Sequence, residues 1–272
     1  MSLNLNAISQ AAVESDNTSV DTSGGGFKKP VPVKGPTLGR IREYVELGQF
    51  APDERGQALG YSAAYKGYLI VELLHKKHQY EMGGKTVPHE VKVFFNKGVK
   101  ATSNYKKLFK MINVATGGTA KTFVDLLNKP FKAKIVHNVV GTGETAKTYA
   151  NLENYDAPER ENDEGDMVPV IVPELSKPIR LFLWENATVD DQMVKDMWES
   201  IYIDGSYTKN AGKDNETQET LNFDQARIMT NLKWEGSRTQ ELVANDGIDL
   251  DTQYDMPPEP DGDNDELPSL DD

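Results

Sequence analysis

Hydrophobic and polar residues alternate in several stretches of the first 155 residues, which is the pattern of half-buried β-strands. In one of them, Val91, Val93 and Phe95 point to one side, and Lys92 and Phe94 point to the other. Alternation of this kind, with an excess of aromatic and β-branched residues, predicts five strands, at residues 37–47, 64–75, 87–96, 131–139 and 147–155.

The apolar spacing changes between the third and fourth predicted strands. Tyr105, Leu108 and Ile112 recur at helical spacing, which predicts a helix over 103–114, and a second short helix is predicted over 119–128. Three strands, a helix and two strands favour a mainly β fold with helices, namely a five-stranded Greek-key barrel of the OB type, with the helix between strands three and four. Another small antiparallel barrel, or an α+β sheet with a helical insertion, has the same element order.

Composition divides the chain into five parts. They are a flexible Ser/Asn/Gly-rich arm (1–35), the barrel (36–155), an acidic linker or long loop (156–178), an extension of strands and helices (179–245), and a disordered acidic tail (246–272). The extension is expected to contain a strand at 180–185, a helix over 188–203 that runs into a short strand, and a helical segment over 221–243 with a break near Gly236. We expect this extension to pack on the barrel or on a second subunit.

The charge is unevenly distributed along the chain. The net charge of −13 alone argues against binding to nucleic acid. However, residues 1–150 carry 21 basic and 12 acidic side chains, whereas residues 246–272 carry 11 acidic side chains and no basic one. Such asymmetry is typical of a nucleic-acid-binding domain with an acidic tail. A lysine-rich solvated face with a solubilising tail is the alternative.

Several function classes have no support in the sequence. The absence of cysteine excludes disulfides, thiolate zinc sites and cysteine nucleophiles. His75 and His78 are expected to be solvated in a loop, and His89 and His137 to be structural, so no metal site is predicted. The stretch GTGETAKT at 141–148 resembles a phosphate-binding loop, but it lacks the second glycine and the following helix. We therefore predict no enzyme activity and no cofactor.

The chain has no apolar run of the ~20 residues that a membrane span needs. Its first residues lack the basic and apolar layout of a signal peptide. We therefore expect a soluble intracellular protein without a membrane partner.

Basic and aromatic side chains alternate on the predicted strands and would share one face if the strands pair in order. Lysines and arginines neutralise phosphates, and aromatic rings stack bases of any sequence, so this arrangement is typical of single-stranded DNA binding. Tyr44, Tyr68 and Phe94 would alternatively belong to the core or to a subunit interface. The candidate single-stranded DNA-binding residues are Arg40, Arg42, Tyr44, Lys66, Tyr68, Lys92, Phe94, Lys97, Lys106, Lys107, Lys132, Lys134 and Tyr149.

The acidic tail is expected to compete with DNA for the basic surface and, when DNA displaces it, to bind partner proteins. Two leucines among the acids offer a partner an apolar contact. The candidate partner-binding residues are Asp261, Asp263, Asp265, Glu266, Leu267, Leu270, Asp271 and Asp272.

Four segments resemble a known family. Residues 40–47 (RIREYVEL), 65–74 (YKGYLIVELL), 126–138 (LLNKPFKAKIVHN) and 147–152 (KTYANL) are similar to the OB-fold single-stranded DNA-binding proteins of tailed bacteriophages. Asn128 stands where the family often has a glycine, and the tail ends in aspartate where many members end in an aromatic residue.

The resemblance implies a non-catalytic protein that coats single-stranded DNA in phage DNA replication or recombination, in the cytoplasm of the infected bacterial host. Its partners would be single-stranded DNA and replication proteins, such as a polymerase, helicase-primase or recombinase, recruited through the tail. A homodimer is also compatible with the family.

Two other functions remain open. One is an acidic interaction or decoy protein that binds a host factor without DNA, and it would bury the basic face under residues 179–245. The other is a nuclease or nucleotide-dependent enzyme, which would need a carboxylate cluster or a working phosphate loop.

Overall fold

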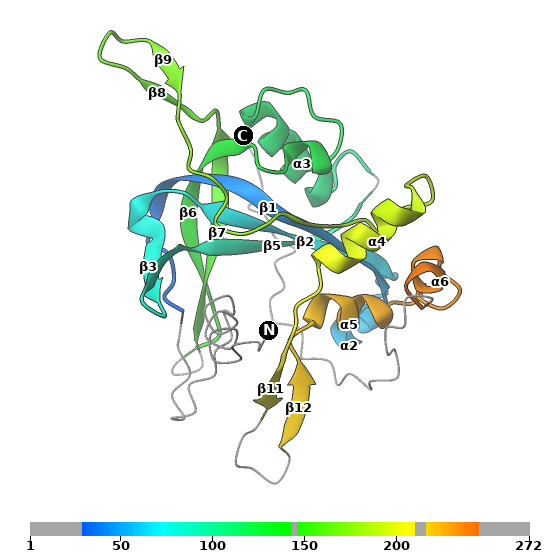
Figure 1. Cartoon of the computed structure of the whole chain (residues 1–272). Coiled ribbons are helices and arrows are strands. Elements are labelled where there is room, and N and C mark those ends of the chain that lie inside the picture. Colours follow the sequence, from blue (N-terminus) through cyan, green and yellow to red (C-terminus); the bar gives the residue numbers. More distant parts are fainter. Residues whose placement is uncertain (1–28, 99, 143–145, 210–215, 245–272) are drawn as a thin grey trace, which may run out of the picture.

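A mixed sheet forms the centre of the protein in the computed structural model, which describes residues 29–98, 100–142, 146–209 and 216–244 (Figure 1). Five antiparallel strands correspond to the five predicted ones. Their order in the sheet is β5 (Glu90–Asn96), β2 (Ala64–Leu73), β1 (Gly35–Phe50), β6 (Pro130–Val140) and β7 (Lys147–Asp156). A short sixth strand, β10 (Arg180–Phe182), pairs in parallel with the second half of β1.

No sheet is closed within the described residues, so the predicted five-stranded Greek-key barrel of the OB type is not confirmed. Strands β5 and β7 lie at the two ends of the strand order, and no ladder joins them within the described residues. Their Cα atoms nevertheless approach within 8 Å, because the sheet curves around its inner face. The architecture is therefore mainly β with several helices.

A β-bulge in β1 changes which residues face the core. Arg40 pairs with Glu72 and Ile41 with Val71, but the next pair is Glu43 with Ile70, so Arg42 is an extra residue. An extra residue shifts the alternation of the residues that follow it, here as far as the second register shift between Glu46 and Gly48. Tyr44 consequently shares the inner face with Ile41, although simple alternation places it beside Arg40 and Arg42.

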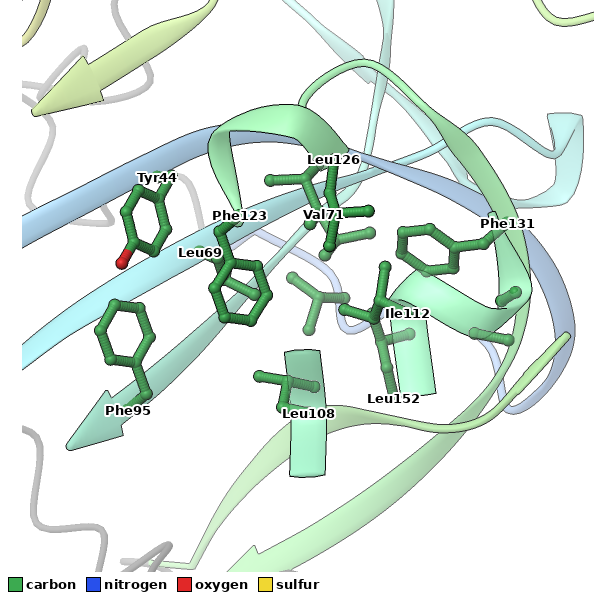
Figure 2. Packing of buried hydrophobic residues seen from close by; sticks show 14 of the residues in the cluster. Tyr44, Leu69, Val71, Phe95, Leu108, Ile112, Phe123, Leu126, Phe131 and Leu152 are labelled. Atoms are coloured by element: carbon green, nitrogen blue, oxygen red, sulfur yellow. The ribbon is translucent and has the colours of Figure 1, made fainter. Parts of the chain in front are cut away.

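The inner face of the sheet is covered by α3 (Asn104–Ala115), which begins where the Ser103 hydroxyl accepts a hydrogen bond from the Lys106 N–H. Leu108 and Ile112 of this helix contact the aromatic and aliphatic residues of the strands (Figure 2). The Phe123 ring stacks on the Tyr44 ring at 5.4 Å between centroids. This core joins all five antiparallel strands to α3.

The predicted helix over 119–128 is largely absent. Only a 3-10 turn, η2 (Val124–Leu126), forms there. The Asp125 carboxylate accepts hydrogen bonds from the backbone N–H groups of Lys121 and Thr122, both at 2.9 Å. Such local side-chain bonds compete with the helical pattern.

The opposite, outer face of the sheet is partly covered by the C-terminal extension. Its helices are α4 (Asp191–Ser200), α5 (Phe223–Met229) and α6 (Arg238–Ala244). A second core forms between them and the sheet, and includes Val45, Tyr68, Phe182, Trp198 and Ile228. Residues of β10, α4, α5 and α6 thus share a core with β1 and β2.

The remaining elements are short and lie between the longer ones. They are α2 (Glu54–Ala58), the 3-10 turn η1 (Lys76–His78) and three hairpins: β3 (Gln79–Met82) with β4 (Lys85–Pro88), β8 (Glu159–Glu161) with β9 (Met167–Pro169), and β11 (Ser206–Lys209) with β12 (Thr217–Thr220). In the described part of the chain, no helix is long and apolar enough to cross a membrane.

His78 is fully buried in η1, contrary to the expectation of a solvated loop histidine. Neither of its ring nitrogens has a hydrogen-bond partner among the described residues. Burial, with a smaller contribution from the charge of Lys77, lowers the pKa of His78 to about 4. Burial also lowers the pKa of the neighbouring His89. Both histidines are therefore held in their neutral forms.

Stability is expected to fall as the pH decreases from 7 to 5. The unfolded chain, with a histidine pKa near 6.5, takes up a proton in this range that folded His78 does not, so the free energy of unfolding falls by about 2 kcal/mol. Urea titrations at both pH values measure this difference. His78→Leu should remove most of it, whereas His75→Asn, at an exposed position three residues earlier, should not. An unchanged pH dependence in His78→Leu would contradict this explanation.

Candidate nucleic-acid interface

Arg40 is buried and fully engaged within the protein, so it is not part of an open DNA-binding face. Its Nε atom lies 2.6 Å from Oε2 of Glu72, and both side chains are at most 2% exposed. Its two terminal nitrogens donate to the backbone carbonyls of Pro173 and Glu174, each at 2.6 Å. These carbonyls belong to residues 173–178, which we call the strap because they cross the outer face of the sheet.

Arg42 is held in the same way. It forms ion pairs with Glu43 at 2.5 Å and Glu90 at 2.8 Å, and donates to the Pro178 carbonyl of the strap at 3.3 Å. Burial alone would raise the pKa of Glu90, but the positive charges of Arg42, Lys177 and Lys29 outweigh it and lower that pKa. The prediction that Arg40 and Arg42 project from a free surface is therefore wrong.

The two tyrosines predicted on the same face are also buried. The bulge at Arg42 turns Tyr44 into the inner core, where its hydroxyl donates to Glu46 at 2.6 Å. Tyr68 does point to the outer face, but α5 covers it and its hydroxyl donates to the Asp224 carboxylate at 2.7 Å. Burial and the adjacent carboxylates raise the pKa of both tyrosines far above the usual value. For both, the core alternative considered from the sequence is the one observed.

Lys97 links parts of the fold. Its Nζ atom lies 2.8 Å from Glu46 and 2.9 Å from Glu185, which connects the end of β5 to β1 and to the loop after β10. Burial lowers the pKa of Lys97, but the two carboxylates outweigh that effect, so the pKa is raised overall. Its predicted role in binding phosphate is therefore replaced by an intramolecular one.

Part of the predicted face remains accessible along β5. Phe94 is 52% exposed and lies edge-on to the Tyr68 ring, with 6.3 Å between ring centroids. The Nζ atom of Lys92, an exposed residue, lies 3.7 Å from the centroid of the same Tyr68 ring. Lys66, which is half-buried, extends this row on the neighbouring strand β2.

The most open basic and aromatic surface lies on the outer face of β6 and β7. Lys132 and Lys134 alternate with the core residues Phe131, Ala133 and Ile135 and therefore point outward. On β7, Tyr149 lies opposite Asn138, which places its ring on the same outer face as Lys134.

Lys147 joins this surface, although it was not predicted as a site residue. It is exposed and lies two residues before Tyr149 on the same strand, so both point to the same side. This alternation was visible in the sequence and would have identified it. We call Lys132, Lys134, Lys147 and Tyr149 the β6–β7 patch.

The side chains of the β6–β7 patch are not engaged with other side chains among the described residues. Its three lysines form no ion pair with any described residue, and the Tyr149 ring contacts no other ring in the described part of the chain. Glu153 lies opposite Lys134 in the register and reduces the local positive charge. An unpaired ammonium and a free ring are the groups that phosphates and bases need.

Lys106 and Lys107 lie on a different surface. They point outward from α3, which covers the inner face of the sheet, whereas the β6–β7 patch points outward from the other face. The structure therefore divides the thirteen predicted residues into three groups: those held inside the fold, those on the accessible part of the outer face, and those on α3. The first group is Arg40, Arg42, Tyr44, Tyr68 and Lys97. The predicted tail residues, from Asp261 to Asp272, lie outside the described residues.

A metal site requires several ligating side chains close together. Among the described residues, no three histidine or carboxylate side chains gather closely enough to hold a metal ion. No known family model matches the chain, and no curated protein is similar to it in sequence.

Proposed function

We propose that this protein binds single-stranded DNA without catalysing a reaction, through a sheet of the OB type. The observation that carries the proposal is the β6–β7 patch, in which unpaired outward lysines flank an accessible tyrosine. The strand order β5-β2-β1-β6-β7, with its two end strands close together, supports a partly open five-stranded barrel.

The proposed mechanism assigns different tasks to the exposed side chains. Lys132, Lys134 and Lys147 neutralise phosphates, and Tyr149 stacks on a base, which contributes roughly 1–3 kcal/mol independently of sequence. Phe94 at the other end of the strand order is a second exposed ring. Arg40 and Arg42 take no direct part, because the strap occupies their donors.

The biological role that we propose follows from the family resemblance. The protein coats single strands during phage DNA replication or recombination in the cytoplasm of an infected bacterium. Its acidic tail competes with DNA for the basic surface and, when DNA displaces it, recruits replication proteins.

A second candidate is a protein-interaction module that does not bind DNA. It is favoured by α5, which lies in the segment 179–245 that was expected to bury the basic face and which covers Tyr68. Arg40 and Arg42 are also buried, but beneath the strap, which precedes that segment. In this alternative the lysines of the β6–β7 patch are only solvated surface groups.

The salt dependence of DNA binding separates the two candidates. With the three lysine–phosphate contacts of the β6–β7 patch, the slope of log K against log salt is expected to be about −2, because single strands release about 0.7 counterion per contact. Fluorescence anisotropy with a labelled short oligo-dT, at several salt concentrations, measures this slope. A duplex of the same length is expected to bind more weakly.

Absence of binding at low salt would favour the interaction module. A salt-independent affinity, or preference for the duplex, would also reject the proposed DNA-binding mode.

A further inference from the structure

A small hairpin projects from the body of the protein at the end of β7 (Figure 1). It consists of β8 and β9, and we call residues 159–171 the hairpin arm. The Asn162 side chain closes its turn by accepting hydrogen bonds from the N–H groups of Glu164 and Asp166, at 3.0 and 2.8 Å. The arm therefore has a defined shape although it pairs with no other strand in the described residues.

Two properties of the hairpin arm indicate that it contacts another surface. A two-stranded hairpin by itself is at best marginally stable in water. In addition, its apolar side chains are exposed: Ile171 is 94% exposed and Met167 is 57% exposed. Burial of these side chains would stabilise the arm.

The charge of the hairpin arm restricts the surface that fits it. It contains one basic residue, Arg160, and no ion pair is formed by its carboxylates within the described part of the chain. Its five acidic residues are Glu159, Glu161, Asp163, Glu164 and Asp166. A complementary surface therefore has unpaired positive charges around an exposed apolar residue.

The outer side of α3 is such a surface. Lys106, Lys107 and Lys110 are exposed there and form no ion pair with described residues. Val114, one turn after Lys110, is 68% exposed. We call these four residues the α3 stripe, and the opposite side of the helix is buried in the inner core.

We propose that the hairpin arm of one copy binds the α3 stripe of a second copy of this chain. The arm does not bind the α3 stripe of its own chain, because it projects away from the body of the protein (Figure 1). Two different surfaces that bind each other in this way form a head-to-tail contact, which continues from copy to copy. If the proposed function holds, such a row forms along a DNA strand, and binding to long strands is cooperative.

Charge reversal tests the contact in the full-length protein. The arm variant carries Asp163→Lys, Glu164→Lys and Asp166→Lys, which changes the charge of the arm from −4 to +2, and the stripe variant carries Lys107→Glu and Lys110→Glu. Each variant alone is expected to weaken self-association by at least about tenfold, because like charges then face each other. An equimolar mixture of the two variants should restore it, since every contact between alternating copies again joins opposite charges.

Sedimentation velocity without DNA measures self-association directly, and titration of long poly-dT measures cooperativity. Lys76→Glu with Lys121→Glu, a matched change of two exposed lysines on neither surface, should associate like the unchanged protein. Circular dichroism verifies that each variant is folded.

Three outcomes would overturn the inference. In the first, the unchanged protein stays monomeric and binds poly-dT without cooperativity. In the second, the charge variants associate like the unchanged protein, and in the third, the mixture fails to restore association. Failure of the proposed function gives a different result from failure of this contact. If the protein self-associates normally but does not bind short oligo-dT, the DNA-binding proposal is rejected and the contact between copies stands.

Discussion

Replacement of Glu72 with alanine is expected to lower the free energy of unfolding by about 3–5 kcal/mol, because it leaves the charge of Arg40 buried without its counter-ion. The two side chains are at most 2% exposed and 2.6 Å apart. Glu72 also accepts the Ser176 N–H at 3.1 Å, so the same substitution releases the strap from β2. Urea unfolding of the variant, with the m-value compared to that of the unchanged protein, measures the loss.

The matched control replaces both partners, as Arg40→Met with Glu72→Leu. Since no unpaired charge remains buried, this variant is expected to recover much of the stability that Glu72→Ala loses. It should also retain its affinity for short oligo-dT. If the double variant is stable but binds oligo-dT much more weakly, Arg40 would have to be assigned a direct role in DNA binding.

Charge reversal in the β6–β7 patch is expected to have the largest effect on DNA binding. Lys134→Glu combined with Lys147→Glu should weaken binding to short oligo-dT by about 30- to 100-fold, or about 2–3 kcal/mol, through lost phosphate contacts and added repulsion. Both lysines are exposed and form no ion pair with described residues, so the free energy of unfolding should change little. Anisotropy titrations at one fixed salt concentration measure the change in affinity.

The stripe variant, Lys107→Glu with Lys110→Glu, is the control. It changes the net charge of the protein by the same amount as Lys134→Glu with Lys147→Glu. It should bind a short oligonucleotide nearly as tightly as the unchanged protein, because α3 lies on a different surface from the patch. Equal losses in the two variants would mean that net charge, and not the β6–β7 patch, governs the affinity.

The long elements could be predicted from local pattern because each buries one face. Strict alternation in β6, where Phe131, Ala133 and Ile135 point inward, identified both the strand and the outward direction of Lys132 and Lys134. The helical spacing of Tyr105, Leu108 and Ile112 located α3. The short hairpin of β8 and β9 was not predicted, since strands of three residues are too short to show a period.

The basic and aromatic side chains predicted to share one face are only partly exposed together, for two physical reasons. The extra residue at Arg42 reversed the alternation beyond it, and nothing in the local pattern of hydrophobic residues marks such a bulge. The strap and α5 then covered Arg40 and Tyr68, although they lie more than 130 residues later in the chain. A polar side chain that finds its partner at such a distance looks the same in sequence as one that faces solvent.

The sequence by itself determined the strands, the α3 helix and the division of charge between a basic first half and an acidic end, because these depend on neighbouring residues and on composition. Only the tertiary structure decided which cations are free. Arg40, Arg42 and Lys97 form ion pairs inside the protein, whereas the lysines of the β6–β7 patch and the α3 stripe form none with the residues that the structure describes. The reason is that a buried charge requires a partner of opposite charge, and the fold brings that partner from distant parts of the chain.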